Sequence, residues 1–214
     1  YPLRRQRQMC IRDRDGRKIG LDQRLINPLL PDEAGTKVNA CIDNVFRIWN
    51  ETSENRSTQL IFCDFGVPTV QKKVKDKDGN AITKSEEDFS KFNIYDDIRS
   101  KLINMGVPQE EIAFIHSAKT KEAKEKLFEK VRNGDVRIMI GSTSKMGAGT
   151  NVQNKLIASH DLNCPWKPRD MEQRRGRMVR QGNENKKVQL FRYVTKDTFD
   201  AYLFQTLENK QRFI

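Results

Sequence analysis

Beyond residue 59, short apolar runs alternate with amphipathic stretches, and this alternation limits the folds available to the chain. The apolar runs lie at 60–63, 112–115, 136–140, 156–158 and 188–193. Helical patterns lie at 94–103 and 123–131. Short apolar runs of this kind are typical of strands that are buried on both faces. The pattern therefore predicts an α/β fold in which a parallel sheet carries helices on both faces.

The two ends of this region are also predicted to be helical. Apolar residues recur at helical spacing over 38–50, and a terminal helix is expected over 198–212. Between residues 15 and 36, Pro28, Pro31 and Gly35 interrupt any long element, so this stretch is expected to be irregular.

A charged stretch at 70–91 interrupts the pattern. Four lysines precede Asp78-Gly79, which is a turn signal, so the stretch is expected to be an exposed insertion. A solvated loop and a hairpin that contacts phosphates are both compatible with these residues.

The first 14 residues carry five arginines and a single acid, Asp13. The stretch 8–13 resembles a translated sequencing adaptor, so residues 1–14 are expected to be non-native or disordered, with native sequence from about Asp15. The alternative is a natural basic arm that binds nucleic acid.

Composition narrows the classes of function. The chain has 214 residues and a net charge of +11, which favours a polyanionic partner, nucleic acid first. No apolar run approaches the ~18 residues of a membrane span, and no signal peptide is visible, so no membrane contact is expected. The four cysteines are scattered and there are two histidines, so neither a zinc site nor a disulfide framework is predicted, and a reducing cytoplasm is the expected location.

Residues 173–182, which we call the arginine segment, read Gln-Arg-Arg-Gly-Arg-Met-Val-Arg-Gln-Gly. On a helix, Arg177 and Arg180 would share one face and Arg174 would extend it. Like charges at this spacing repel unless an anion lies among them, and a phosphate matches the guanidinium fork. Gly176 indicates close approach of another backbone. The alternative is a solvated basic face.

Other polar residues have simpler interpretations. Asp170 and Gln173 have the spacing of a capping box at the start of this helix. His116 and His160 are expected to be structural.

Several motifs, in a fixed order, resemble the C-terminal RecA-like lobe of superfamily-two helicases and translocases, most nearly the Swi/Snf branch. The motifs are 142–153 with its Gly-x-Gly-x-Asn core, Asp161, Pro165-Trp166-Lys167-Pro168, the arginine segment and Thr198-Phe199-Asp200. More narrowly, 37–49 and 59–64 resemble the very large helicase–methylase proteins of phages and integrative elements.

The resemblance implies a RecA-like sheet and assigns roles to individual residues. The arginine fingers would be Arg177 and Arg180. Nucleotide contacts would come from Gln173, Gly147, Gly149 and Asn151. Sequence-independent contacts to the DNA backbone would come from Ser117, Lys119, Ser142, Thr143, Lys145 and Thr150. No residue is expected to bind a metal.

The resemblance also divides the chain. Residues 15–55 would be an inter-lobe connection and leading helix, and 56–214 the helicase C-terminal domain with its insertion at 70–91. The sequence lacks the G-x-x-x-x-G-K-[ST] loop and an Asp-Glu magnesium pair. ATP and magnesium would therefore be bound mainly by an N-terminal lobe outside this chain, and the isolated chain is expected to be inactive. The alternative is a module that binds nucleic acid or a partner without hydrolysis.

Overall fold

The structure is a computed structural model that describes residues 13–66, 92–146, 150–165, 167–178 and 180–212, and the backbone of 73–75 and 81–83. The side chains of residues 177, 211 and 212 are outside this description. The expectations for residues 1–12 lie outside it as well.

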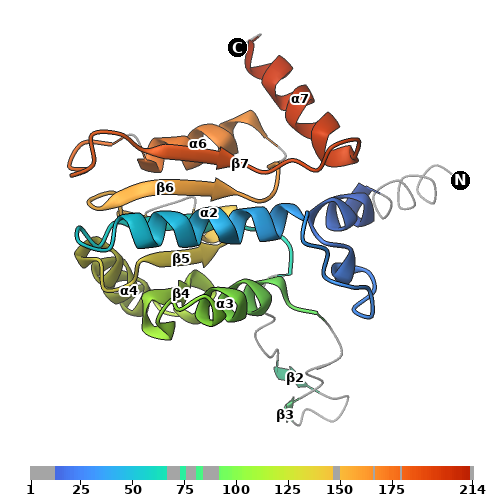
Figure 1. Cartoon of the computed structure of the whole chain (residues 1–214). Helices are drawn as coiled ribbons and strands as arrows, with labels where there is room; N and C mark the ends of the chain where they lie inside the picture. The colour runs from blue at the N-terminus through green and yellow to red at the C-terminus, as the bar shows by residue number, and fades with distance from the viewer. Residues whose placement is uncertain are drawn as a thin grey trace, which may run out of the picture.

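Five parallel strands form the central sheet (Figure 1). They are β1 (Thr58–Phe62), β4 (Ile112–Phe114), β5 (Ile138–Gly141), β6 (Leu156–Asp161) and β7 (Gln189–Arg192). Their order is β4-β5-β1-β6-β7, and every pair between neighbours is parallel. Strand β1 lies in the middle and is buried throughout. The predicted parallel sheet, including the outer strand near residue 190, is confirmed.

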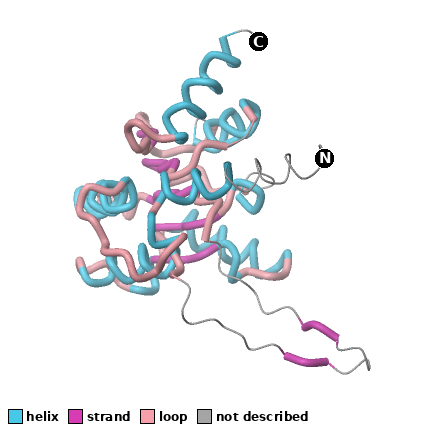
Figure 2. Tube along the Cα trace, turned by 90° about the vertical axis from the view of Figure 1, so that its right-hand side faces the viewer, coloured by secondary structure: helices cyan, strands magenta, loops and turns pink. Residues whose placement is uncertain are grey.

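Helices cover both faces of this sheet (Figure 2). One face carries α2 (Lys37–Glu51) and α3 (Ile94–Asn104), which bury apolar residues against Ile61 of β1. The opposite face packs Leu60 and Phe62 against α4 (Lys121–Asn133), the short α5 (Thr143–Met146) and the end of α6 (Pro168–Met178). Alternate residues of β1 therefore enter two separate cores, as expected for a strand between two helical layers. Helix α7 (Phe199–Arg212) packs on α6 through Phe204 and Leu207.

The predicted end of α4 shows how local sequence sets a boundary. Thr120 accepts a hydrogen bond from the backbone N–H of Ala123 at the start of the helix, and Gly134 ends it with φ of 82°. A Cβ on Gly134 would lie 2.7 Å from the backbone oxygen of Arg56. Both the conformation and the close approach therefore require glycine here.

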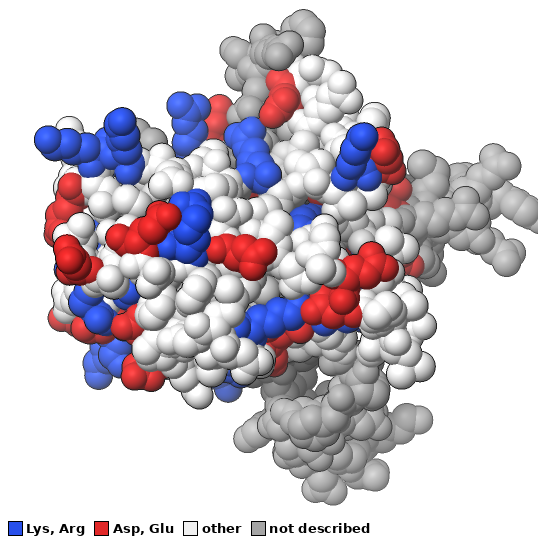
Figure 3. All heavy atoms as spheres, viewed as in Figure 1, with Lys and Arg blue, Asp and Glu red and all other residues white. Residues whose placement is uncertain are grey.

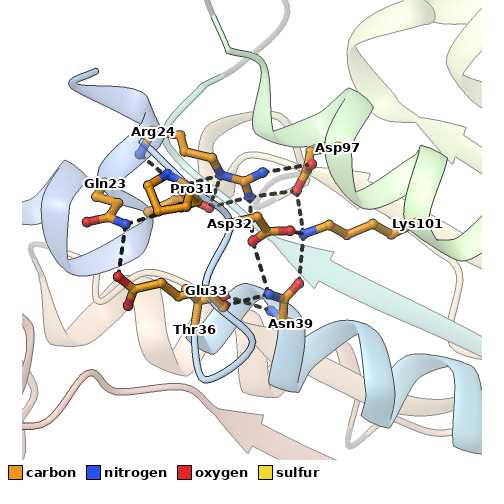
Figure 4. A network of polar contacts seen from close by, with 10 residues as sticks. Gln23, Arg24, Pro31, Asp32, Glu33, Thr36, Asn39, Asp97 and Lys101 are labelled. Carbon is orange, nitrogen blue, oxygen red and sulfur yellow. Dashed lines mark hydrogen bonds and ion pairs between the residues drawn. The ribbon is translucent and has the colours of Figure 1, made fainter. Parts of the chain in front are cut away.

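The expectation that residues 15–36 are irregular was wrong in part. Residues 13–21 are helical, and η1 (Gln23–Leu25) follows. An ionic network then holds the following loop against α2 and α3 (Figure 4). Arg24 bonds Asp97 of α3 at 3.0 Å, and Lys101 contacts both Asp97 and Asp32. Lys101 and Asp97 are an i,i+4 pair within α3, whereas Arg24 and Asp32 are far from α3 in sequence, so no local pattern predicts their contacts with it.

The insertion at 70–91 contains a paired hairpin. Strands β2 (Lys73–Lys75) and β3 (Ala81–Thr83) are antiparallel, with Lys73 opposite Thr83. The Asp78-Gly79 turn lies outside the described residues. The backbone of these two strands pairs as a hairpin, and contact of the insertion with phosphates stays a prediction. In the described part of the chain, no helix is long and apolar enough to cross a membrane.

His160, expected to be structural, lies on β6 between the neighbouring strands β1 and β7. It is fully buried, with Nε2 3.0 Å from Gln59 Oε1 and Nδ1 2.8 Å from the Tyr193 hydroxyl. Its ring stacks on Phe191, with the ring centroids 5.0 Å apart. Burial lowers the pKa of His160 to about 3, and the positive charge of Arg47 acts in the same direction. The structural interpretation is confirmed.

The burial of neutral His160 predicts that acid destabilises the fold. Above the unfolded pKa of ~6.5, both states are neutral at this position; below it, only the unfolded state binds the proton until the folded pKa is reached. We expect His160 alone to lower the free energy of unfolding by about 1.6 kcal/mol between pH 6.5 and 5, as measured by urea titration. His160→Gln should remove this part of the pH dependence; an unchanged dependence in the variant would contradict the assignment.

Candidate functional site

The carboxyl ends of β1, β5 and β6 bring together polar residues that are far apart in sequence. Asp64 follows β1 by two residues, Thr143 follows β5 by two, and Asp161 ends β6. Open parallel sheets bind ligands at this edge, where the sequence motifs were expected to lie. The three residues converge on Arg174 of α6.

Arg174 is almost completely buried at this edge, with 1% of its surface exposed. One terminal nitrogen donates to Asp161 Oδ1 at 2.9 Å and to the backbone oxygen of Asn163 at 3.0 Å. The other donates to Asp64 Oδ2 at 3.0 Å, and Nε donates to the Thr143 hydroxyl at 3.1 Å. The guanidinium also lies over the Phe62 ring, 4.9 Å from its centroid. We call these five residues with Arg174 the Arg174 centre.

Asp64 links two sides of this centre. Its Oδ1 accepts the backbone N–H of Thr143 at 2.7 Å, and its Oδ2 accepts the Thr143 hydroxyl at 2.9 Å as well as Arg174. Its own N–H donates to the side chain of Asn163. Sequence reasoning did not identify Asp64 as a site residue. An acid placed directly after a buried strand was the available signal.

Asp161 is the more deeply buried carboxylate. Burial raises its pKa above the ordinary value, although the adjacent charge of Arg174 opposes this shift. A charge pair with additional hydrogen bonds is the arrangement that makes such burial tolerable.

The expected arginine stripe is wrong in two respects. Arg174 lies on the buried face of α6 with Met171 and Met178, so it is neutralised by Asp64 and Asp161 rather than by a ligand. Helix α6 ends at Met178, so Arg180 does not share a helical face with Arg177. Arg180 is exposed just beyond the helix, and the side chain of Arg177 lies outside the description. Local spacing could show neither the tertiary acids nor the early end of the helix.

Two details at α6 also differ from expectation. The helix begins at Pro168, which is a favourable first residue, so Asp170 lies within its first turn and is not the cap. Its negative charge there favours the helix dipole. A Cβ on Gly176 would meet nothing within 4 Å among the described residues. The close backbone approach expected at Gly176 is therefore not present within this part of the chain. Gln173, the predicted nucleotide contact, is half-buried on the same helix.

Residues 142–153, the glycine-rich segment, have most of their described polar side chains engaged. The Ser142 hydroxyl lies 3.1 Å from that of Ser144, Thr143 bonds Asp64, and the Thr150 hydroxyl donates to the backbone of Met146. Lys145 is exposed. The predicted contacts Gly147 and Gly149 lie outside the described residues.

The C-terminal end of the glycine-rich segment contacts α4 and the arginine segment. Asn151 is exposed, and its backbone oxygen accepts a hydrogen bond from Arg132 of α4. Gln153 donates to the backbone of Gln181 at 3.5 Å, so this end of the segment lies beside the end of the arginine segment. Among their described residues, the two segments therefore meet through Thr143 and Arg174 and again through Gln153 and Gln181.

The loop after β4 reaches the same edge. η3 (Ile115–Ser117) places His116 Nε2 3.2 Å from the Ser142 hydroxyl, with its ring edge-on to Tyr95. Burial lowers the pKa of His116, and the charges of Lys145 and Lys124 add to this. Ser117 is exposed, although its hydroxyl donates to the backbone of Phe114, and Lys119 is exposed.

A second buried ion pair lies between α2 and α7. Lys37 Nζ is 2.6 Å from Asp200 Oδ2, and each side chain is 3% exposed. Burial lowers the pKa of Lys37, and Asp200 opposes that shift. Arg17 donates to the backbone oxygen of Cys164 at 2.5 Å, which ties the residue 13–21 helix to the same region. Across the described ranges, no group of three or more His, Cys, Asp or Glu side chains could hold a metal ion.

Replacing Arg174 should destabilise the fold strongly. Arg174→Ala leaves Asp161 buried without its partner, so we expect a loss of about 3–5 kcal/mol in the free energy of unfolding, measured by urea titration. Arg175→Ala, at the exposed neighbouring position of the same helix, should change it by less than about 0.5 kcal/mol. Equal effects of the two substitutions would refute the role assigned to Arg174.

Comparisons with known proteins identify the family of this chain. Residues 37–182 match the family model described as "Helicase conserved C-terminal domain". The structure resembles that of the C-terminal part of the Fun30 ATPase domain, with a TM-score of 0.56 and 17% identity over 83% of this chain and 47% of that one. It also resembles the DUF1998 helicase MrfA bound to DNA, with a TM-score of 0.49 and 13% identity over 80% of this chain and 20% of that one.

A sequence relative is the Defense against restriction protein B of Escherichia phage P1. It is 32% identical over 90 residues, which are 42% of this chain and 4% of that protein. The chain thus spans less than half the length of each of these three proteins. The family match covers more than half of the chain and includes both the Arg174 centre and the arginine segment. The chain therefore belongs to the helicase conserved C-terminal domain family, and its fold is that of a helicase C-terminal lobe.

Proposed function

We propose that this chain is the C-terminal motor lobe of an ATP-dependent DNA helicase or translocase. The proposal rests on the different environments of two arginines in the arginine segment. Arg174 is buried and anchors α6 to the edge of the sheet, whereas Arg180 is exposed immediately beyond the helix. An exposed arginine on a firmly anchored element is suited to contact a phosphate that another lobe binds.

In this mechanism, ATP and magnesium are held mainly by an N-terminal lobe of the same full-length protein. The sequence contains no phosphate-binding G-x-x-x-x-G-K-[ST] loop, which supports this arrangement. Arg180, with Arg177, would add positive charge where negative charge develops on the γ-phosphate, while Gln173, Asn151 and the glycines of the glycine-rich segment would contact the nucleotide. The open surface at Gly176 is compatible with an opposing lobe.

DNA would be held through its backbone, independently of sequence. Among the predicted contacts, Lys119, Lys145 and Ser117 are exposed and suited to this role. Ser142, Thr143 and Thr150 would act mainly by shaping the loop, because their hydroxyls bond within the chain. On the face formed by α2 and α3, acidic and basic side chains are interspersed (Figure 3), so that face offers no uniform field for a polyanion.

The kind of full-length protein that contains this lobe is also a proposal. The relative in a phage supports an origin in a phage or mobile element, and its much greater length accords with a motor lobe inside a larger protein. A Swi/Snf-like duplex translocase, with a fused methylase as in helicase–methylase proteins, remains the narrower form of this proposal.

The finger assignment predicts the behaviour of one variant of the full-length protein. Arg180→Ala should lower the rate of ATP hydrolysis by about 10³-fold or more, as loss of an arginine finger does in related phosphoryl-transfer enzymes. Its affinity for duplex DNA should stay close to that of the wild type in a fluorescence anisotropy titration. Arg175→Ala should retain hydrolysis. If Arg180→Ala hydrolyses ATP normally, the lobe is instead a module that binds nucleic acid or a partner without contributing to hydrolysis.

The backbone-contact assignment predicts a change in salt dependence. Lys145→Ala should weaken binding to duplexes of unrelated sequence by the same factor and reduce the slope of log K against log salt by about 1, because one phosphate contact is lost. Arg47→Ala on α2 should leave the slope unchanged. A sequence-dependent loss, or equal effects of both variants, would contradict the assignment.

A further inference from the structure

We propose that Asp64 is a positioning residue that couples DNA contact to ATP hydrolysis in this motor lobe. This inference rests on the proposed function and adds to it a residue outside the arginine and glycine-rich segments. The Asp64 carboxylate binds Thr143, at the start of the glycine-rich segment, and at the same time Arg174, which anchors α6.

The geometry gives each oxygen of Asp64 a separate task. Oδ1 accepts the backbone N–H of Thr143 at 2.7 Å, which holds the first residue of α5 in place. Oδ2 accepts both the Thr143 hydroxyl at 2.9 Å and Arg174 at 3.0 Å. A displacement of the glycine-rich segment therefore alters the contacts that Arg174 makes.

The anchoring of α6 does not depend on Asp64 alone. Arg174 also bonds Asp161 and the backbone of Asn163, both on the segment that ends β6. Removing the charge of Asp64 would therefore leave α6 attached to the sheet and, through Arg174, to the Thr143 hydroxyl, while weakening the carboxylate bridge that also holds the backbone of Thr143. A variant without this charge can therefore distinguish a coupling role of Asp64 from a purely structural one.

The position of Asp64 also differs from that of the buried pair beneath it. The Asp64 side chain is 26% exposed, whereas those of Asp161 and Arg174 are 3% and 1% exposed. A partly exposed carboxylate at the rim can change partners when a neighbouring segment moves, without first being extracted from the core. Such an element with two possible arrangements is what coupling between sites requires.

The test compares ATP hydrolysis by the full-length protein with and without a linear DNA duplex of mixed sequence. Asp64→Asn preserves size but removes the charge and one acceptor oxygen. We expect the ratio of the DNA-stimulated to the DNA-free rate to fall about fivefold or more, the range typical of coupling between sites. Taking the ratio within each variant cancels any difference in the fraction of folded protein. Glu51→Gln, the same chemical change at an exposed ion pair of α2, should keep the wild-type ratio.

A second variant keeps the proposal testable if Asp64→Asn does not fold. Thr143→Val removes the hydroxyl that bonds Asp64 and Arg174 but keeps the backbone N–H bond to Oδ1, so the ratio should fall by a smaller factor. The coupling role would be overturned if every folded variant kept the wild-type ratio of DNA-stimulated to DNA-free hydrolysis. It would also be overturned if the DNA-stimulated and DNA-free rates fell by the same factor. If Arg180→Ala is inactive while Asp64→Asn keeps the ratio, only this inference fails. If Arg180→Ala stays active, or the wild-type rate does not respond to DNA, the proposed function itself fails.

Discussion

The ion pairs and hydrogen bonds of the buried Arg174 guanidinium are the interactions on which the carboxyl edge of the sheet depends. A charged group withdrawn from water is tolerated only when its donors meet acceptors of opposite charge, and Asp64 and Asp161 supply them from the ends of two strands. The Thr143 hydroxyl and the Asn163 carbonyl complete the set. One side chain of α6 thereby holds the loops after β1, β5 and β6 in a single arrangement.

A similar principle recurs around the sheet. Lys37 and Asp200 join α2 to α7, and Arg24 joins the segment before α2 to Asp97 of α3. Each pair connects parts of the chain that are distant in sequence, and each is buried or half-buried. Breaking such a pair leaves an uncompensated charge, so these contacts favour one arrangement of the elements over its alternatives. The apolar cores on the two faces of the sheet contain most of the buried side chains, whereas the ion pairs determine the positions of the outer elements relative to the sheet.

The arginine segment places a buried and an exposed arginine within a few residues of each other. Arg174 faces inward and stabilises, whereas Arg180 lies outside the helix and is exposed. A Cβ on Gly176, between these two arginines, would meet nothing within 4 Å among the described residues, so this side of α6 is not covered by them. The same residues that carry the family resemblance thus divide into an anchor and a candidate finger.

The sequence by itself determined the alternation of strands and helices, the end of α4 at Gly134, and the candidate segments at the carboxyl edge. These follow from periodicity and from the special backbone of glycine, which act over a few residues. Tertiary structure alone decided that Arg174 is an anchor, that Asp64 belongs to the Arg174 centre and that residues 13–21 form a helix. The acids that neutralise Arg174 lie 110 and 13 residues away from it, and only the folded sheet brings the more distant one within 3.0 Å. Local patterns show which charges are neighbours along a helix, whereas burial and partner choice depend on the whole fold.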